Sequence, residues 1–187
     1  MREIEVETFL NPMNDGISKP ALVIGDDQKE YIIKNQQVYE NGKYVEYDCM
    51  FLNEMLAFYI GDYLGVPMPE AVVAKVNQES IDADAKIRFA YRFEEGKYFA
   101  TKELKKVENN ILKNYKMLLS MRKPYIIKPW NKFFKDVNNK EDIAKILAFD
   151  ILIANFDRYN NIGNILVDNT DERKIYAIDH GHSFFRP

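Results

Sequence analysis

The sequence has few of the residues that build disulfide bonds or transition-metal sites. Its 187 residues include one cysteine, Cys49, and two histidines. A single cysteine excludes a disulfide within the chain and is typical of a protein from a reducing compartment. Two histidines without a neighbouring thiol are a thin ligand set for zinc or a related metal. The chemistry of this chain must therefore be sought in its carboxylates, amides and cations.

The sequence also lacks a long apolar run and a strong excess of charge. No stretch approaches the roughly 18 apolar residues of a membrane-spanning helix, and no signal peptide is expected. The 26 Lys and Arg residues against 29 Asp and Glu residues give a net charge of −3, so bulk charge indicates no nucleic-acid partner. We expect a soluble, cytoplasmic globular protein with no membrane association, long enough to bury roughly 70% of its unfolded surface in one or two lobes.

What the sequence does contain is an ordered pattern near its C-terminal end. The apolar segment Ile146–Ala154 predicts a buried helix, and a polar loop over residues 157–164 follows it. Two short apolar segments, Ile165–Val167 and Ile175–Ile178, predict a β-hairpin because turn-forming residues separate them. Asp179 comes directly after the second strand. The pattern is therefore a helix, a polar loop, a hairpin and a final acid.

Three oxygen-bearing side chains are expected at the open end of this hairpin: Asp157, Asn164 and Asp179. Oxygen ligands without thiols suit magnesium or manganese better than zinc. Phosphoryl transfer needs one carboxylate to orient a hydroxyl, and an amide and a second carboxylate to hold the metal on the nucleotide phosphates. The alternative is that the Asp and Asn residues of the loop only cap and turn its backbone. The ordered set favours a functional site.

The segment D-H-G-H gives another hypothesis for the same region. His180 and His182, together with Asp157, suggest a transition-metal site and a metal-dependent hydrolase. Two histidines on one short segment, with no third histidine and no cysteine nearby, are weak support for such a site. We therefore prefer the oxygen-ligand interpretation.

The N-terminal part of the chain predicts a small sheet. Ile4–Leu10, Ala21–Ile24 and Glu30–Lys34 are expected strands. The loop between the first two of them contains Gly16, which would let backbone amides approach a phosphate, and Ser18, which would add a hydroxyl. This loop has no glycine-rich repeat, so a plain turn is the alternative.

Lys34 ends an apolar strand, a position from which its ammonium can reach the phosphates of a nucleotide. Residues 51–65 then predict a helix that Gly65 caps and Pro67 stops. Glu54 lies beside the expected apolar face of this helix, so we predict an ion pair with Lys34. That apolar face is expected to comprise Leu52, Met55, Leu56, Tyr59, Ile60 and Tyr63.

The middle of the chain gives less specific expectations. Ala71–Val76 predicts a strand, residues 77–87 a loop, and Ile87–Phe93 with Lys97–Thr101 a hairpin. Residues 102–121 predict one amphipathic helix, or two with a break at Asn109-Asn110, with the lysines on a solvated face. For the helix that precedes the polar loop, Asn138 or Asn139 is the expected N-terminal cap.

Two runs of sequence together resemble the HipA-like kinases, a branch of the protein-kinase superfamily. They are Y-I-I-K…L-N-E-M-L-A-F-Y-I-G-D-Y-L-G-V-P-M-P-E, and N-F-D-R-Y…N-I-L-V with A-I-D-H-G-H-S-F. The resemblance covers about residues 8 to 185. It implies that Asp157 is the catalytic Asp, that Asn164 and Asp179 bind the metal, and that Arg158 braces the loop.

The loop departs from the family pattern. The family more often has its Asn five residues after the Asp, whereas position 162 is Ile here and Asn164 is seven residues away. Asn161 is therefore an alternative metal ligand. Tyr159 stands where the family has a His.

The resemblance implies an α+β, two-lobed protein-kinase-like fold. Residues 1–100 would form a small β-rich N-lobe with the Glu54 helix, and residues 101–187 a short, mainly helical C-lobe with the catalytic loop and hairpin. It implies transfer of the γ-phosphoryl group of ATP, with Mg²⁺, to a hydroxyl, most simply a protein Ser or Thr. The alternative is a nucleotide-binding pseudokinase that acts as a partner-binding module. The family usually continues with further helices after Asp179, so a shortened chain, a compact kinase and a module completed by a partner chain stay open.

Overall fold

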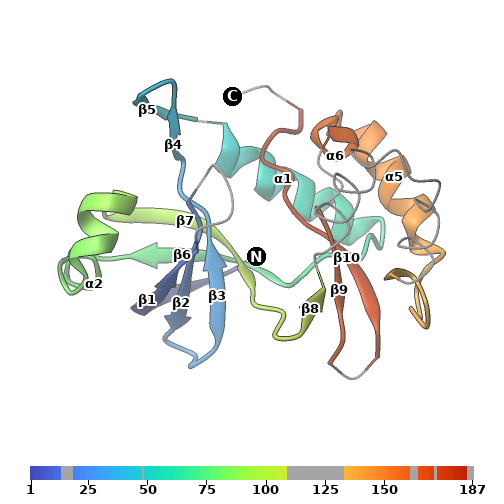
Figure 1. Ribbon diagram of the computed structural model, residues 1–187, viewed down its shortest axis with the longest axis horizontal. Coiled ribbons are helices and arrows are strands. Elements are labelled where there is room, and N and C mark those ends of the chain that lie inside the picture. Colours follow the sequence, from blue (N-terminus) through green and yellow to red (C-terminus); the bar gives the residue numbers. More distant parts are fainter. Residues whose placement is uncertain (14–18, 48, 109–132, 161–163, 171, 185–187) are drawn as a thin grey trace, which may run out of the picture. The chain divides into compact units, whose positions relative to one another are not determined.

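The computed structural model describes residues 1–13, 19–47, 49–108, 133–160, 164–170 and 172–184 (Figure 1). It is a mixed α+β chain that divides into two compact units. Unit 1 comprises Met1–Met55 and Pro69–Glu103, and unit 2 comprises Leu56–Met68 and Leu104–Arg186. Helix α1 (Met50–Tyr63) begins in unit 1 and ends in unit 2.

The elements that lie wholly within one unit are as follows. Unit 1 contains β1 (Arg2–Pro12), β2 (Ala21–Gly25), β3 (Glu30–Ile33), β4 (Gln37–Glu40), β5 (Lys43–Glu46), β6 (Ala71–Val76), α2 (Gln78–Asp82), the π-helix η1 (Ile87–Tyr91) and β7 (Gly96–Lys102). Unit 2 contains β8 (Val107–Glu108), α5 (Asp142–Leu152), α6 (Asp157–Asn160), β9 (Ile165–Asp168) and β10 (Lys174–Ala177).

Unit 1 is built on a closed barrel in which the strand order is β1, β2, β3, β7 and β6. All neighbours are antiparallel except β1 and β6, which run parallel. Because successive residues of a strand point to opposite faces, Ile4 and Val6 of β1 enter the core while Glu3 and Glu5 face outward. Glu3 pairs with Lys97 at 2.6 Å and Glu5 with Lys75 at 3.1 Å on the outer surface.

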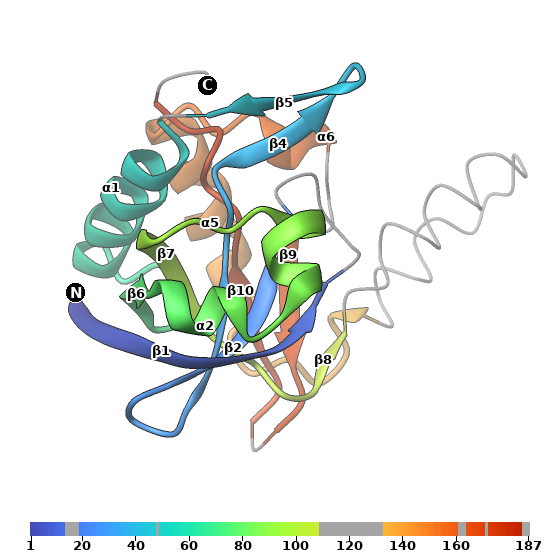
Figure 2. The same ribbon diagram turned by 90° about the vertical axis from the view of Figure 1, so that its left-hand side faces the viewer.

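A β-bulge in β1 changes which of its side chains enter the core. The pairing register with β2 shifts between Val6 and Thr8, and Phe9 rather than Thr8 is buried. A bulge inserts one unpaired residue and so reverses the alternation beyond it. Helix α2 then packs against β1, where the Ser80 hydroxyl donates a hydrogen bond of 3.0 Å to the Val6 carbonyl (Figure 2).

Unit 2 is organised around a small antiparallel sheet in which β9 lies between β10 and β8 (Figure 1). The predicted hairpin is therefore confirmed, with Ile165 opposite Ala177 and Val167 opposite Ile175. These four side chains are buried, and α5 packs on the same core. The other members of this core are Ala57, Val66, Phe133, Val137, Ile146, Phe149 and Ile153.

Helix α1 confirms the predicted helix and its stop signal, but its buried face is different from the predicted one. Gly65 has φ +67°, and its N–H and that of Val66 bond back to Asp62 and Gly61. The expected apolar face was wrong, because Leu52 and Tyr59 are each 47% exposed and Tyr63 is 89% exposed. The buried positions fall at three- and four-residue spacing and are mostly small or polar: Met50, Asn53, Glu54, Ala57 and Gly61.

Several expectations for the middle of the chain were also wrong. Residues 78–82 form α2, which Asn77 caps, instead of a loop. Residues 87–91 form the π-helix η1 instead of a strand, and β7 pairs with β6 and β3. The helix expected over 102–121 does not begin as predicted, because Val107 and Glu108 pair with β9; its remainder lies outside the described residues. Strands β4 and β5 had no counterpart in the prediction.

The start of the C-terminal pattern also differs in detail. Helix α5 begins at Asp142 without a side-chain cap, so neither Asn138 nor Asn139 caps it as predicted. The Asn139 side chain instead contacts the Asp142 carboxylate at 3.2 Å and accepts a hydrogen bond from the Ile175 N–H at 2.8 Å. The first four residues of the predicted loop form the short helix α6. Within the described ranges, no helix is long and apolar enough to cross a membrane.

We predict that Gly65→Ala lowers the free energy of unfolding by about 1 kcal/mol, because an L-residue is strained in the left-handed region. No heavy atom lies within 4 Å of a Cβ built at this position, so backbone strain is the only new cost. Urea denaturation would measure the change. Gly96→Ala is the control, since a Cβ there also meets nothing within 4 Å and its φ is not positive. Equal changes in the free energy of unfolding for the two substitutions would contradict the left-handed conformation assigned to Gly65.

Candidate active site

The first group of candidate residues lies in unit 1, where Lys34 and Glu54 form an ion pair. Tyr31 and Ile33 of β3 point into the barrel core, and Lys34 follows directly after the strand. Its backbone N–H donates a hydrogen bond of 3.3 Å to the Phe99 carbonyl of β7. The Glu54 side chain is 3% exposed and that of Lys34 is 18% exposed. The predicted pairing of these two residues is therefore confirmed.

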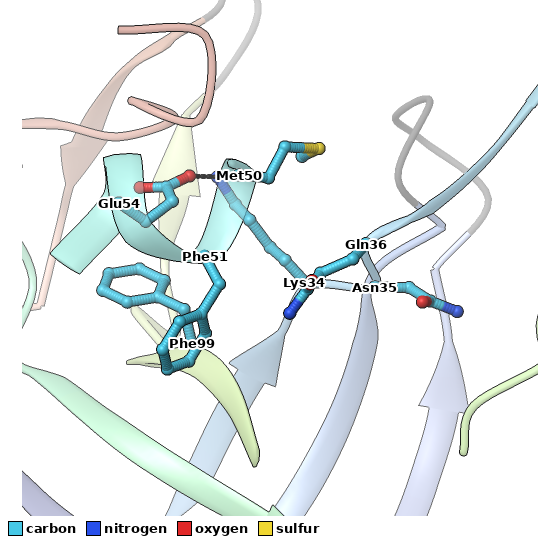
Figure 3. Close-up of a pocket in the computed structure, with 7 residues that line it drawn as sticks. All are labelled: Lys34, Asn35, Gln36, Met50, Phe51, Glu54 and Phe99. Carbon is cyan, nitrogen blue, oxygen red and sulfur yellow. Dashed lines mark hydrogen bonds and ion pairs between the residues drawn. The ribbon is translucent and has the colours of Figure 1, made fainter. Parts of the chain in front are cut away.

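A pocket lies beside this ion pair (Figure 3). Figure 3 shows the Lys34 side chain extending toward Glu54 of α1. The lining residues are Lys34, Asn35, Gln36, Met50, Phe51, Glu54 and Phe99. Apolar walls reduce the screening of charge by water, so the ammonium acts more strongly on an anion here than on an open surface.

The second group lies in unit 2, where the Asn164 side chain reaches Asp157. The Asn164 amide donates a hydrogen bond of 3.3 Å to Oδ2 of Asp157. Asp157 is half-buried in the first turn of α6, and Asn164 is 5% exposed, directly before β9. Because the Asn164 amide nitrogen makes this bond, its Oδ1 remains outside it, and Oδ1 is the atom that would bind a metal.

Asp179 is joined to the same group through the backbone. The N–H of its neighbour Ile178 donates a hydrogen bond of 3.1 Å to the Asn164 carbonyl. Asp179 itself has φ 65°, a left-handed conformation that Asp and Asn adopt more readily than most residues. The structure therefore brings the Asp157 and Asn164 side chains into contact and places Asp179 directly after a residue that bonds to the Asn164 backbone.

Arg158 is the cation at the centre of this group. It is 4% exposed. Its Nη1 donates hydrogen bonds to the Asn164 carbonyl and, at 3.2 Å, to the Ile178 carbonyl. Its Nη2 lies 3.1 Å from Nε2 of His180, which must be the acceptor because a guanidinium only donates. The expectation that Arg158 braces the loop agrees with these contacts.

Two residues that the sequence interpretation missed complete the arrangement, namely Asp150 of α5 and Asn155. The Asp150 carboxylate accepts from Nε of Arg158 through Oδ2 and from the Asn155 amide at 3.1 Å through Oδ1, and both residues are fully buried. Burial raises the pKa of the Asp150 carboxyl above its ordinary value, and Arg158 opposes that rise. The sequence did offer a signal for Asp150, because it is an acid within an apolar helical segment. A buried charge requires a partner, so the pattern indicates an interaction with a cation.

The donor set fits magnesium better than a transition metal. Across the described segments, no three His, Cys, Asp or Glu side chains lie close enough together to hold a metal ion. An amide and a carboxylate would therefore need further oxygen atoms, which nucleotide phosphates and water supply to Mg²⁺. His180 packs edge-on against the Phe149 ring, with 5.8 Å between the ring centroids, while it accepts from Arg158. These contacts differ from those expected of His180 as a ligand of the transition-metal site that a hydrolase would need.

Three predicted site residues lie outside the described residues: Gly16, Ser18 and Asn161. They therefore stay predictions, as does the role of the loop that contains the first two.

A lysine held by a glutamate, and a loop Asp in contact with an Asn, are features of kinases. The profile of the HipA-like kinase family matches residues 6–187, and the chain therefore belongs to this family. This membership confirms the predicted family resemblance and indicates a kinase. No curated protein matches the chain.

We predict that Arg158→Ala lowers the free energy of unfolding by about 3–5 kcal/mol, because it leaves the Asp150 carboxylate buried without its counter-charge. Urea denaturation of the purified variant would measure this loss. Arg88→Ala is the matched control, since Arg88 pairs with Asp82 at 2.8 Å but both side chains are about half exposed. Its loss should stay within about 1 kcal/mol. Similar losses in the free energy of unfolding for both variants would show that burial of the Arg158–Asp150 pair does not increase the cost of removing the arginine.

Proposed function

We propose that this protein is an ATP-dependent phosphotransferase that moves the γ-phosphoryl group to a hydroxyl, with a protein Ser or Thr as the acceptor. The observation that carries the proposal is the contact between Asp157 and Asn164, which the Ile178 hydrogen bond joins to the backbone of Asp179. These are a carboxylate for the acceptor hydroxyl and two oxygen donors for a metal ion. The buried Lys34–Glu54 pair gives independent support.

Each residue would have a distinct task. Lys34, oriented by Glu54, would hold the phosphates of the nucleotide through its ammonium group. Asp157 would accept a hydrogen bond from the acceptor hydroxyl and take its proton as the hydroxyl oxygen bonds to the γ-phosphorus. The bond between that phosphorus and the bridging oxygen breaks, and ADP leaves with the bonding electrons. Neither carboxylate forms a covalent bond to the phosphoryl group.

Asn164 and Asp179 are the residues that would hold a magnesium ion, through the amide oxygen and the carboxylate. When bound, Mg²⁺ neutralises negative charge on the phosphate oxygens. Arg158 would keep these two residues in place and would not touch the substrate, because its guanidinium is buried against protein groups.

The acceptor and partner proposals rest on narrower grounds. Analogy with the family favours a protein hydroxyl as the phosphoryl acceptor. The sequence shows no basic amphipathic face that would indicate binding to a lipid surface. The net charge of −3 gives no reason to expect a nucleic-acid partner. We therefore propose a protein substrate or partner chain. The single cysteine, Cys49, supports the proposal of a cytoplasmic location.

A nucleotide-binding pseudokinase is the second candidate, and one sequence feature favours it. The separation of seven residues between Asp157 and Asn164 is longer than the usual five. The 3.3 Å contact between their side chains weighs against it, because the longer separation still lets the amide reach the acid. Binding of ATP without turnover would support this candidate.

We predict that Asp157→Ala lowers kcat by about 10²- to 10⁴-fold, the usual contribution of a positioned general base, while ATP binding persists. Magnesium-dependent release of ADP and autophosphorylation, measured beside nucleotide binding, would test this expectation. Asp62→Ala is the control, because Asp62 is an exposed acid on α1. Unchanged turnover in Asp157→Ala would exclude the proposed role, and absence of nucleotide binding in the wild type would exclude both candidates.

We predict that Glu54→Gln lowers kcat/KM for ATP by about 10- to 100-fold, because a hydrogen bond to a charged group contributes about 1.5–3 kcal/mol. The variant keeps the shape of the side chain but removes the charge that orients Lys34. Steady-state kinetics over a range of ATP concentrations would measure the effect. Glu95→Gln, an exposed position, should behave as wild type. A kcat/KM equal to that of wild type in Glu54→Gln would rule out a role for the pair in nucleotide use.

A further inference from the structure

Among the described residues of unit 2, the Asp150 carboxylate is the most deeply buried charged group that the mechanism above leaves without a task. It has no exposed surface and projects from α5, whose neighbouring side chains Ile146 and Phe149 are buried and apolar. A buried charge of this kind is costly unless every partner is in place. Stability alone therefore does not account for a carboxylate at this position of an apolar helix.

The contacts of Asp150 lead directly to the proposed metal-binding residues. Oδ2 accepts from Nε of Arg158, and Oδ1 accepts from the Asn155 amide at 3.1 Å. On its other side the same guanidinium donates to the Asn164 and Ile178 carbonyls. Asn164 is itself a proposed metal ligand, and Ile178 directly precedes the other one, Asp179. The orientation of one planar group therefore sets the backbone of both ligands.

We propose that Asp150 is a positioning residue for phosphoryl transfer: its carboxylate fixes the Arg158 guanidinium, which in turn fixes the backbone that carries Asn164 and Asp179. This inference rests on the proposed phosphotransferase function. A guanidinium is planar and holds its donors in a fixed fork, so a carboxylate at Nε determines where both Nη1 hydrogens point. A lysine in its place would lack this directional control.

The same contacts bear on how the site is regulated. In many kinases an added phosphoryl group pairs with arginine and orders the loops around the site. Here, four of the five N–H donors of Arg158 already have acceptors, and Asp150 supplies the anionic one. Groups of the chain itself therefore occupy most of the donors of Arg158, and phosphatase treatment should leave exchange of the Ile178 amide hydrogen unchanged.

Four variants test the proposal: Asp150→Asn, Arg158→Gln, their combination, and Asp142→Asn as control. Asp142 lies on the same helix, but it pairs with Lys145 at the surface at 2.8 Å. Among the described residues, it makes no hydrogen bond or ion pair with Arg158. The first readout is exchange of the Ile178 amide hydrogen, which bonds the Asn164 carbonyl, in protein without metal or nucleotide. The second is kcat together with the magnesium concentration that gives half-maximal rate.

In Asp150→Asn we expect Ile178 exchange to rise by about tenfold or more. We expect kcat to fall, and the magnesium requirement to rise, by about 10- to 100-fold, the usual cost of losing a residue that orients a metal ligand. Asp142→Asn should match wild type in all three measurements. Because Asp150 acts through Arg158, Asp150→Asn should change kcat little further in an Arg158→Gln background.

The uncharged combination separates positioning from folding. If Asp150→Asn alone does not fold, Asp150→Asn with Arg158→Gln removes both charges and should recover the wild-type melting temperature. Recovered stability with low turnover and fast Ile178 exchange would support the proposal. Recovered turnover and protection would overturn it, as would wild-type values in folded Asp150→Asn, equal effects in both backgrounds, or loss of protection after phosphatase treatment.

The exchange experiment also distinguishes this inference from the proposed function. If the wild type shows no ATP turnover, the phosphotransferase proposal fails. Ile178 exchange in the metal-free protein still decides whether Asp150 holds this backbone.

Discussion

The guanidinium of Arg158 carries a permanent charge in a place that water scarcely reaches, with 4% of the residue exposed. A buried cation of this kind persists only if its acceptors are all present together. Those acceptors come from three stretches of unit 2: Asp150 of α5, the Asn164 carbonyl before β9, and the Ile178 carbonyl with the His180 ring after β10. The helix, the loop and the hairpin end must therefore be assembled together, and the candidate metal ligands are assembled with them.

A similar constraint operates in unit 1. Glu54 is 3% exposed and projects from a helix whose other buried positions are mostly small or polar, such as Ala57 and Gly61. Burial of an acid and a lysine side by side contributes little net stability, because desolvation offsets their attraction. What the pair provides is a fixed direction for the Lys34 ammonium beside a pocket with apolar walls. In both units, buried charge therefore fixes geometry more than it adds to stability.

The sequence predicted the parts of the fold whose signals are local. The hairpin of β9 and β10 and the Gly65 stop follow from short-range pattern and spacing. The Lys34–Glu54 pair joins residues 20 positions apart, and its prediction also needed the chemistry of nucleotide binding. Ile87–Phe93 has the alternating pattern of a strand, and it was predicted to pair with the next strand along the chain, β7. In the structure β7 pairs instead with β6 and β3, which are more distant in sequence. The sequence did contain a signal for the missed hairpin of β4 and β5, namely the dipeptide Asn41-Gly42. Asn-Gly is typical of two-residue hairpin turns, and both residues have the positive φ that such a turn requires. The buried face of α1 was not readable, because tertiary contacts and not hydrophobicity select it.

The long separation between Asp157 and Asn164 shows why spacing along a chain is a poor measure of spacing within a site. Residues in an α-helix advance only about 1.5 Å each, against more than 3 Å in an extended chain. Four residues of this stretch form α6, which therefore advances about 6 Å. The Asn164 amide lies 3.3 Å from the Asp157 carboxylate despite the longer separation along the chain. A motif with two extra residues can thus preserve the contact between its side chains, provided that a helical turn absorbs the added length.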